Sequence, residues 1–107
     1  MAYVYLLGDS GRENCFKIGM TRGKINKRIK QLQTGNGGEI YLVDYFETEY
    51  PFFIERSMHM KFFNKHTLNE WYELNTDDIT NFKEYCQLYE DNAKSLKNNH
   101  FANNILK

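Results

Sequence analysis

Two short runs of branched and aromatic side chains open the sequence, at Tyr3–Leu7 and Cys15–Met20. The stretch between them is rich in glycine and small polar residues, so the pattern predicts a β-hairpin. We expect Tyr5 to lie opposite Lys17. Because strand side chains alternate with a period of two, one face is then uniformly apolar and holds Val4, Leu6, Phe16 and Ile18. The other face carries the polar side chains, including Tyr5 and Lys17.

A helical periodicity follows at Lys24–Gln33. Its apolar residues recur at the spacing of one helix face, at Ile25, Ile29 and Leu32. Gly35 supplies a C-terminal stop. Arg28 borders the apolar stripe, whereas two lysines point towards solvent, Lys27 and Lys30.

The remaining pattern predicts one more strand and two more helices. Residues 40–47 alternate as a third strand, and Pro51 suits the first turn of a helix that runs to about Asn64. Asn75 or Thr76 caps a third helix, whose apolar face carries Ile79, Phe82, Cys86 and Tyr89. We therefore expect an α/β (α+β) domain with a small, mainly antiparallel, three-stranded central sheet flanked by about three helices.

Composition limits this architecture to one domain. The 107 residues, 41% of them hydrophobic, can bury one core and leave no room for a second ordinary domain. We expect this domain at residues 1–90, with residues 91–107 as a C-terminal helix extension or frayed tail. No stretch approaches the roughly 20 consecutive apolar residues of a membrane span, and no signal sequence opens the chain. We expect an intracellular protein without a membrane partner.

The charges are unevenly distributed although the net charge is zero. Residues 1–38 hold seven Lys and Arg against two acids, whereas residues 39–74 hold three against seven. Only the first third is suited to attract phosphate, and its candidate nucleic-acid-binding residues are Arg22, Lys24, Lys27 and Lys30. The alternative is a short basic helix that is merely a solvated face.

The two cysteines, Cys15 and Cys86, lie far apart and have no zinc-type spacing. We expect both to be reduced. An enzyme that uses either cysteine as a nucleophile lacks a histidine partner at a recognisable motif.

The ordered motifs of the chain resemble those of the GIY-YIG nucleases over roughly residues 3–74. Tyr5 falls on the tyrosine of the first motif, and Ile18-Gly19 on the end of the second. Lys17 stands where the second motif usually has tyrosine, which is similar to restriction enzymes and a phage-type branch of the superfamily. That branch also has an E-x-x-x-H helix before an E-W-aromatic signature, matched here by Glu55, His59 and Glu70-Trp71-Tyr72.

The resemblance implies a role for each matched residue. Glu55 is the candidate ligand of one divalent metal, Mg²⁺ or Mn²⁺. Arg28 stabilises the phosphoryl charge, and Tyr5 and Lys17 activate the attacking water. His59, one turn after Glu55, orients the water or contacts phosphate. Each residue also has an ordinary structural explanation as a surface or packing side chain; for Trp71 and Tyr72 we favour packing.

The resemblance therefore implies a metal-dependent endonuclease that hydrolyses phosphodiester bonds in nucleic acid, with DNA favoured over RNA. The alternative is a catalytically inactive nucleic-acid-binding or protein-interaction module with the same fold, which zero net charge and Lys17 keep open. Since one small domain leaves no room for a separate DNA-reading module, we expect weak sequence preference unless a homodimer or a targeting partner protein adds it.

Overall fold

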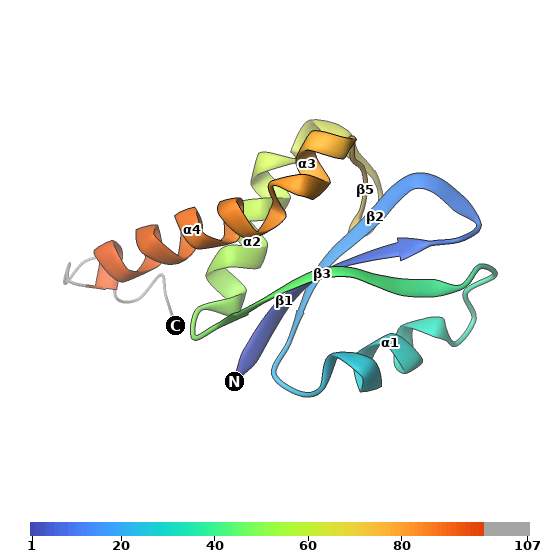
Figure 1. Cartoon of the computed structure of the whole chain (residues 1–107), viewed down its shortest axis with the longest axis horizontal. Coiled ribbons are helices and arrows are strands. Elements are labelled where there is room, and N and C mark those ends of the chain that lie inside the picture. Colours follow the sequence, from blue (N-terminus) through green and yellow to red (C-terminus); the bar gives the residue numbers. More distant parts are fainter. Residues whose placement is uncertain (98–107) are drawn as a thin grey trace.

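The computed structural model describes residues 1–97, in which five strands and four α-helices form one mixed unit (Figure 1). The strands are β1 (Ala2–Asp9), β2 (Arg12–Thr21), β3 (Ile40–Thr48), β4 (His66–Leu68) and β5 (Trp71–Glu73). The helices are α1 (Ile25–Gln33), α2 (Pro51–Lys61), α3 (Thr76–Thr80) and α4 (Phe82–Lys97), with a 3-10 turn η1 (Phe63–Lys65). The strand order is β3-β1-β2-β5-β4, and every pair is antiparallel.

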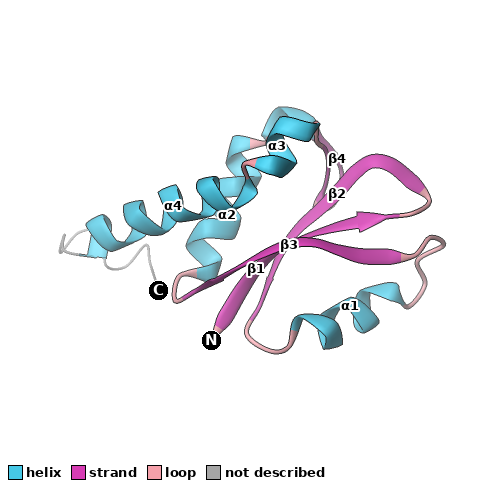
Figure 2. Cartoon of the chain, viewed as in Figure 1, coloured by secondary structure: helices cyan, strands magenta, loops and turns pink. Residues whose placement is uncertain are grey.

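Helices cover both faces of this sheet (Figure 2). On one face, Ile29 and Leu32 of α1 pack on a small cluster of Tyr5, Leu7 and Ile40. The larger core lies on the opposite face, where α2 and α4 meet the sheet; its fully buried members include Val4, Leu6, Ile18, Ile54, Met58 and Cys86. Because β1 is covered on both faces, its sequence is apolar almost throughout instead of alternating.

The β1–β2 register differs from the prediction. Tyr5 lies opposite Gly19, and Lys17 lies opposite Leu7, so the predicted Tyr5–Lys17 pair is wrong. The pairing shifts between Gly8 and Asp9, where extra residues of β2, including Asn14 with φ 61°, bulge out of the ladder. The predicted and observed registers differ by two residues. Because strand side chains alternate with a period of two, each side chain still lies on its predicted face. The predicted apolar face is confirmed, since Val4, Leu6, Phe16 and Ile18 all belong to the larger core.

The predicted three-stranded sheet is a five-stranded one in the described residues. Its three long strands match the predicted ones, but β4 and β5 span only three residues each, too short to produce a recognisable alternation. The predicted third helix is also two helices. The Asn75 cap is confirmed, and Asn81 then closes α3 before α4 begins at Phe82; asparagine has a low helix propensity.

The other predicted element ends are close to the observed ones. Gly35 has φ +78° and follows the end of α1, as expected of a helix stop. Pro51 opens α2, which ends at Lys61, slightly before the predicted end. Helix α4 continues beyond residue 90 to Lys97, and the rest of the predicted helix extension or tail at 91–107, residues 98–107, lies outside the described residues. Within residues 1–97, none of the helices combines the length and the apolar character that spanning a membrane requires.

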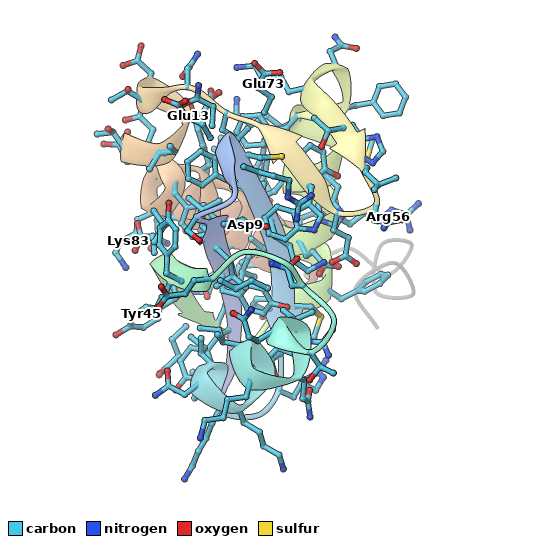
Figure 3. The ribbon with its side chains drawn as sticks, turned by 90° about the vertical axis from the view of Figure 1, so that its right-hand side faces the viewer. Asp9, Glu13, Tyr45, Arg56, Glu73 and Lys83 are labelled. Carbon is cyan, nitrogen blue, oxygen red and sulfur yellow. The ribbon has the colours of Figure 1, made fainter. Side chains whose placement is uncertain are left out.

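The Asp9 side chain joins the β1–β2 turn to the loop after α1 (Figure 3). It accepts hydrogen bonds from the Gly11 backbone N–H at 2.8 Å, Arg12 Nε at 3.0 Å and Asn36 Nδ2 at 3.2 Å. Only 3% of this side chain is exposed. Burial by itself raises the Asp9 pKa, but these three donors and the Arg12 charge outweigh it and hold the pKa below its ordinary value. The loop that follows α1 is therefore anchored by an ionised carboxylate.

Candidate functional site

The candidate site lies along the edge of β2 that β5 leaves unpaired, beside the first residue of β5. Strand β5 pairs with β2 only over Cys15–Lys17. Next along β2, the Ile18 backbone N–H donates to the Glu70 carbonyl at 3.3 Å. The Ile18 carbonyl oxygen lies 2.8 Å from His59 Nε2. The start of β5, the turn before it and helix α2 thus meet at this edge of β2.

Three side chains at this edge form a cluster of potential metal ligands: Glu55, His59 and Glu70. One ligand atom from each lies within 4.8 Å of the others, and all three residues are half-buried. Glu55 and His59 are one helical turn apart on α2, which places them on the same helix face. Glu70 comes from the turn between β4 and β5. Carboxylate oxygens and an imidazole nitrogen are a donor set that suits a divalent cation.

The orientation of His59 follows from its contacts. A backbone carbonyl can only accept a hydrogen bond, so His59 Nε2 donates its proton to the Ile18 carbonyl. In the neutral ring Nδ1 then carries a free lone pair. The ring also packs against Tyr72, with ring centroids 5.4 Å apart. His59 is therefore held in one tautomer and one orientation.

Lys17 connects this cluster to the sheet. Its Nζ lies 3.2 Å from Glu70 Oε2, and only 11% of the Lys17 side chain is exposed, against 45% for Glu70. The same Nζ lies 5.9 Å from the centre of the Trp71 ring. Lys17 is thus a nearly buried cation at the border of an acidic cluster.

Tyr5 and Arg28 form a second pair of site residues. Arg28 Nε donates to the Tyr5 hydroxyl at 3.4 Å, and Nη1 donates to Gln31 at 3.3 Å. Burial raises the Tyr5 pKa above its ordinary value; the hydrogen bond and charge of Arg28 lower it, and the Glu70 and Glu55 charges raise it further. Tyr5 is therefore a neutral phenol near pH 7, suited to hydrogen-bond a substrate or water.

Glu55 also has a raised pKa. Burial is the largest cause; the His59 charge lowers the pKa, the Glu70 carboxylate raises it, and Lys17 and the Met20 backbone N–H lower it. A cation bound near two half-buried carboxylates stabilises the ionised form of both, and so offsets the burial and the mutual repulsion that oppose ionisation. The residues present therefore fit a divalent metal ion.

The four predicted nucleic-acid-binding residues do not belong to this cluster. Arg22, Lys24, Lys27 and Lys30 are all exposed, on α1 and the loop before it. Two of them, Arg22 and Lys24, line a hollow of about 550 Å³ together with Tyr3 and Tyr45. The basic residues thus lie on elements other than those of the acidic cluster, and Arg28 of α1 contacts Tyr5.

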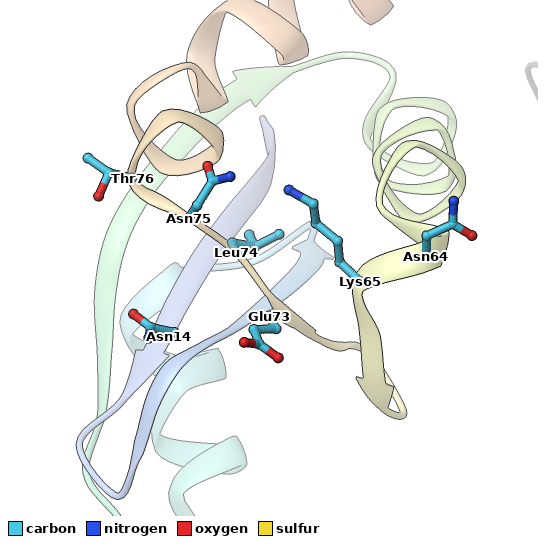
Figure 4. Close-up of a pocket in the computed structure, with 7 residues that line it drawn as sticks. All are labelled: Asn14, Asn64, Lys65, Glu73, Leu74, Asn75 and Thr76. Atoms are coloured by element: carbon cyan, nitrogen blue, oxygen red, sulfur yellow. The ribbon is translucent and has the colours of Figure 1, made fainter.

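A different hollow, of about 500 Å³, lies beside the last residues of β5 (Figure 4). Its lining includes Asn14, Lys65, Glu73 and Asn75, and it contains none of the predicted site residues. The predicted catalytic residues lie instead on β1, β2, α1 and α2.

The sequence analysis assigns no role to two residues that the structure places at the site, Glu70 and Gly19. Glu70 was visible as the first residue of the E-W-aromatic triplet, but its place beside Glu55 depends on a short β4–β5 turn that the sequence pattern does not reveal. Gly19 was visible in the second motif; its importance depends on the register with Tyr5. Trp71 and Tyr72 are 8% and 4% exposed, so the packing role predicted for them is confirmed.

Comparison with known protein families matches residues 2–88 to a family described as the T5orf172 domain. Curated proteins and solved structures gave no match.

Proposed function

The chain belongs to the T5orf172 domain family, and we propose that it is a metal-dependent endonuclease that hydrolyses phosphodiester bonds, preferably in DNA. The association of this domain with nuclease-like proteins of phages and bacteria supports the proposal. The observation that carries it is the meeting of Tyr5 with Arg28, and of Lys17 with the Glu55 cluster, at the central strand pair β1–β2.

Arg28 binds the phosphate in this proposal. Its guanidinium presents a planar set of donors that matches two phosphate oxygens, and it cannot lose its charge at working pH. The hydrogen bond to Tyr5 holds the Nε side of the group near the sheet. Because the guanidinium is half-buried, its charge is less screened there than that of an exposed arginine.

Tyr5 and Lys17 position the attacking water. The neutral Tyr5 hydroxyl accepts from Arg28 and retains its own O–H to donate. Lys17 brings a cation from the neighbouring strand, two residues before Gly19. The residue that takes the proton from the water must first lose its own proton, as a phenolate or a neutral amine.

Glu55 would hold Mg²⁺ or Mn²⁺, with His59 one turn away on α2. A bound divalent cation supplies neutralisation of the phosphate charge and lowers the pKa of water. The contribution of this chain is to keep two carboxylates close together at a half-buried position.

Cleavage of supercoiled plasmid in Mg²⁺ or Mn²⁺ tests the proposal. We expect nicked and linear products from the wild-type chain. Glu55→Gln and Arg28→Ala should each lower the rate by about 100-fold or more, since both remove stabilisation of charge at the reacting phosphate. Matched controls are Glu73→Gln, an exposed acid on β5, and Arg56→Ala, an exposed arginine next to Glu55 that projects away from the molecule (Figure 3).

The same assay separates the enzyme from an inactive module. If wild-type protein binds plasmid and never cuts it in either metal, the catalytically inactive nucleic-acid-binding module is the better description. Equal cleavage by wild type and Glu55→Gln would reject the assigned metal ligand. Competition with RNA of the same sequence then measures the preference for DNA.

A further inference from the structure

We propose that Glu55, Nδ1 of His59 and Glu70 form a three-ligand site that prefers a divalent first-row transition metal such as Mn²⁺ to Mg²⁺. We further propose that Glu70 leaves Lys17 when the metal binds. The inference deepens the proposed function and rests on it for the requirement of a metal. It differs from that function in naming three ligands instead of Glu55 alone, and in the metal that they select.

The donor set favours a transition metal. One carboxylate oxygen of each glutamate and one ring nitrogen of His59 lie within 4.8 Å of one another, so one ion can contact all three residues after small side-chain rotations. Mg²⁺ prefers an all-oxygen shell and keeps much of its water, whereas imidazole nitrogen is a better ligand for transition ions. Replacing one carboxylate by an imidazole therefore shifts selectivity away from Mg²⁺.

The hydrogen bond between His59 and Ile18 also supports His59 as a metal ligand. Histidines that bind metals usually donate their other ring N–H to a carbonyl or a carboxylate, which fixes the tautomer and makes the ring a better ligand. His59 makes such a bond, with Nε2 2.8 Å from the Ile18 carbonyl. This partner belongs to the backbone of β2 and lies outside the ligand cluster. The free Nδ1 lone pair is thus oriented by the fold before any ion binds.

Lys17 is the cation that the metal ion would replace as the partner of Glu70. Its ammonium lies 3.2 Å from Glu70 and neutralises that carboxylate. A metal ion at the cluster competes with Lys17 for the same oxygens. The Lys17 side chain is 11% exposed and has little room to move, whereas the Glu70 side chain is 45% exposed and can rotate. Metal binding would therefore release Lys17 to face an incoming phosphate or water.

Trp71 provides a signal for binding that does not depend on cleavage. It is the one tryptophan of the sequence, it follows Glu70 directly, and its ring centre is 5.9 Å from Lys17 Nζ. Paramagnetic Mn²⁺ bound at the adjacent residue Glu70 should quench the indole fluorescence. Thermal unfolding gives a second signal, since an ion that binds only the folded chain raises the melting temperature.

The test is a titration of the full chain with MnCl₂ and with MgCl₂, without substrate, followed by Trp71 fluorescence and melting temperature. We expect Mn²⁺ to bind at least about tenfold more tightly than Mg²⁺. His59→Gln can keep an amide donor near the Ile18 carbonyl but lacks Nδ1, and should abolish this preference. Glu70→Gln should weaken both ions by about tenfold or more, because even outer-shell partners of metals are worth that much.

Two further comparisons isolate the ligands. Lys17→Met removes the competing ammonium and should tighten Mn²⁺ binding. The control variant Glu73→Gln changes an exposed acid outside the cluster and should bind both ions as wild type does. Circular dichroism and urea midpoints check that each variant is folded; if His59→Gln is not, Glu70→Gln and Lys17→Met still decide.

The outcomes separate this inference from the proposed function. Equal affinities for Mn²⁺ and Mg²⁺ in wild type, or wild-type Mn²⁺ binding by folded Glu70→Gln, would overturn the three-ligand site. Cleavage that depends on Glu55 would then still support the nuclease. Conversely, selective Mn²⁺ binding without any cleavage would reject the nuclease and leave the metal site in place.

Discussion

The Tyr5 ring lies across the backbone of Gly19 on the neighbouring strand. The two residues are directly opposite each other in the β1–β2 pair, and a Cβ built on Gly19 would lie 2.5 Å from the Tyr5 hydroxyl oxygen and 2.6 Å from its ring carbon. Any side chain at position 19 therefore occupies the space that the phenol fills. Glycine allows the Tyr5 hydroxyl to reach Arg28, and so links the second motif to the first.

Gly19→Ala should therefore destabilise the fold and displace the Tyr5 hydroxyl. Overpacking of this kind costs about 1–3 kcal/mol, measured as the free energy of unfolding in urea. In a Tyr5→Ala background the cost should fall to less than half, because the clashing ring is gone. Gly37→Ala is the control, since no atom lies within 4 Å of its added Cβ. Equal costs of Gly19→Ala in both backgrounds would show that the ring is not the obstacle.

The sequence predicts the faces of the hairpin better than its register. Alternation identifies which side chains share a face, and Val4 and Ile18 do lie together in the core. Alternation cannot distinguish registers that differ by two residues, since both put the same side chains on the same face. The bulge near Asn14 decides between them, and it places Gly19 rather than Lys17 opposite Tyr5.

The candidate site was predictable where its residues are close in sequence or carry a recognisable motif. Glu55 and His59 follow from helical spacing alone, because residues four apart share a helix face. Glu70 required knowledge of the β4–β5 hairpin, whose strands span three residues each. The Lys17–Glu70 ion pair joins positions 53 residues apart and arises only when β5 docks on β2. Such long-range pairs have no local sequence signal.

Acid should weaken the fold partly through Asp9. Its folded-state pKa is depressed, so its contribution is complete above about pH 4, the ordinary value in the unfolded chain, and is lost as the pH falls through the folded-state value. Asp9→Asn should cost about 1–3 kcal/mol at pH 7, because it weakens the bonds from Gly11, Arg12 and Asn36. Urea midpoints at pH 7 and pH 3 should then differ less than in wild type.

The control for this pH effect is Asp91→Asn, an exposed acid on α4. It should leave the difference between the two midpoints close to that of wild type. If Asp9→Asn loses as much stability on acidification as wild type does, another carboxylate accounts for the acid sensitivity.

The two cysteines should differ sharply in reactivity. Burial raises the pKa of Cys86 to about 12, with a further rise from Asp44, and the residue is 0% exposed in the larger core. Cys15 is half-buried on β2. Since the thiolate is the reactive form, Ellman's reagent at pH 8 should label one thiol in the native chain and both in denaturant. Cys15→Ser should remove the fast reaction; labelling of Cys86 in the folded Cys15→Ser variant would contradict its burial.

The basic residues of α1 should govern affinity for nucleic acid without governing the rate of cleavage. Lys27 and Lys30 are exposed on α1 and do not belong to the Glu55 cluster. Lys27→Gln with Lys30→Gln should reduce the slope of log affinity against log salt for duplex DNA by about 0.9 for each lost phosphate contact. Anisotropy in a Glu55→Gln background measures this slope. The maximal cleavage rate of the same pair, with Glu55 intact and DNA saturating, should stay within about twofold of wild type.

A matched pair separates a specific basic surface from the effect of net charge. Lys94→Gln with Lys97→Gln removes the same charge from exposed positions at the end of α4. If the phosphate backbone binds along α1, the α4 pair should leave the salt slope unchanged, because counterions are released only where side chains contact phosphates. Equal slopes for the two double variants would mean that α1 carries no binding surface, and that Arg28 meets its phosphate without help from the residues around it.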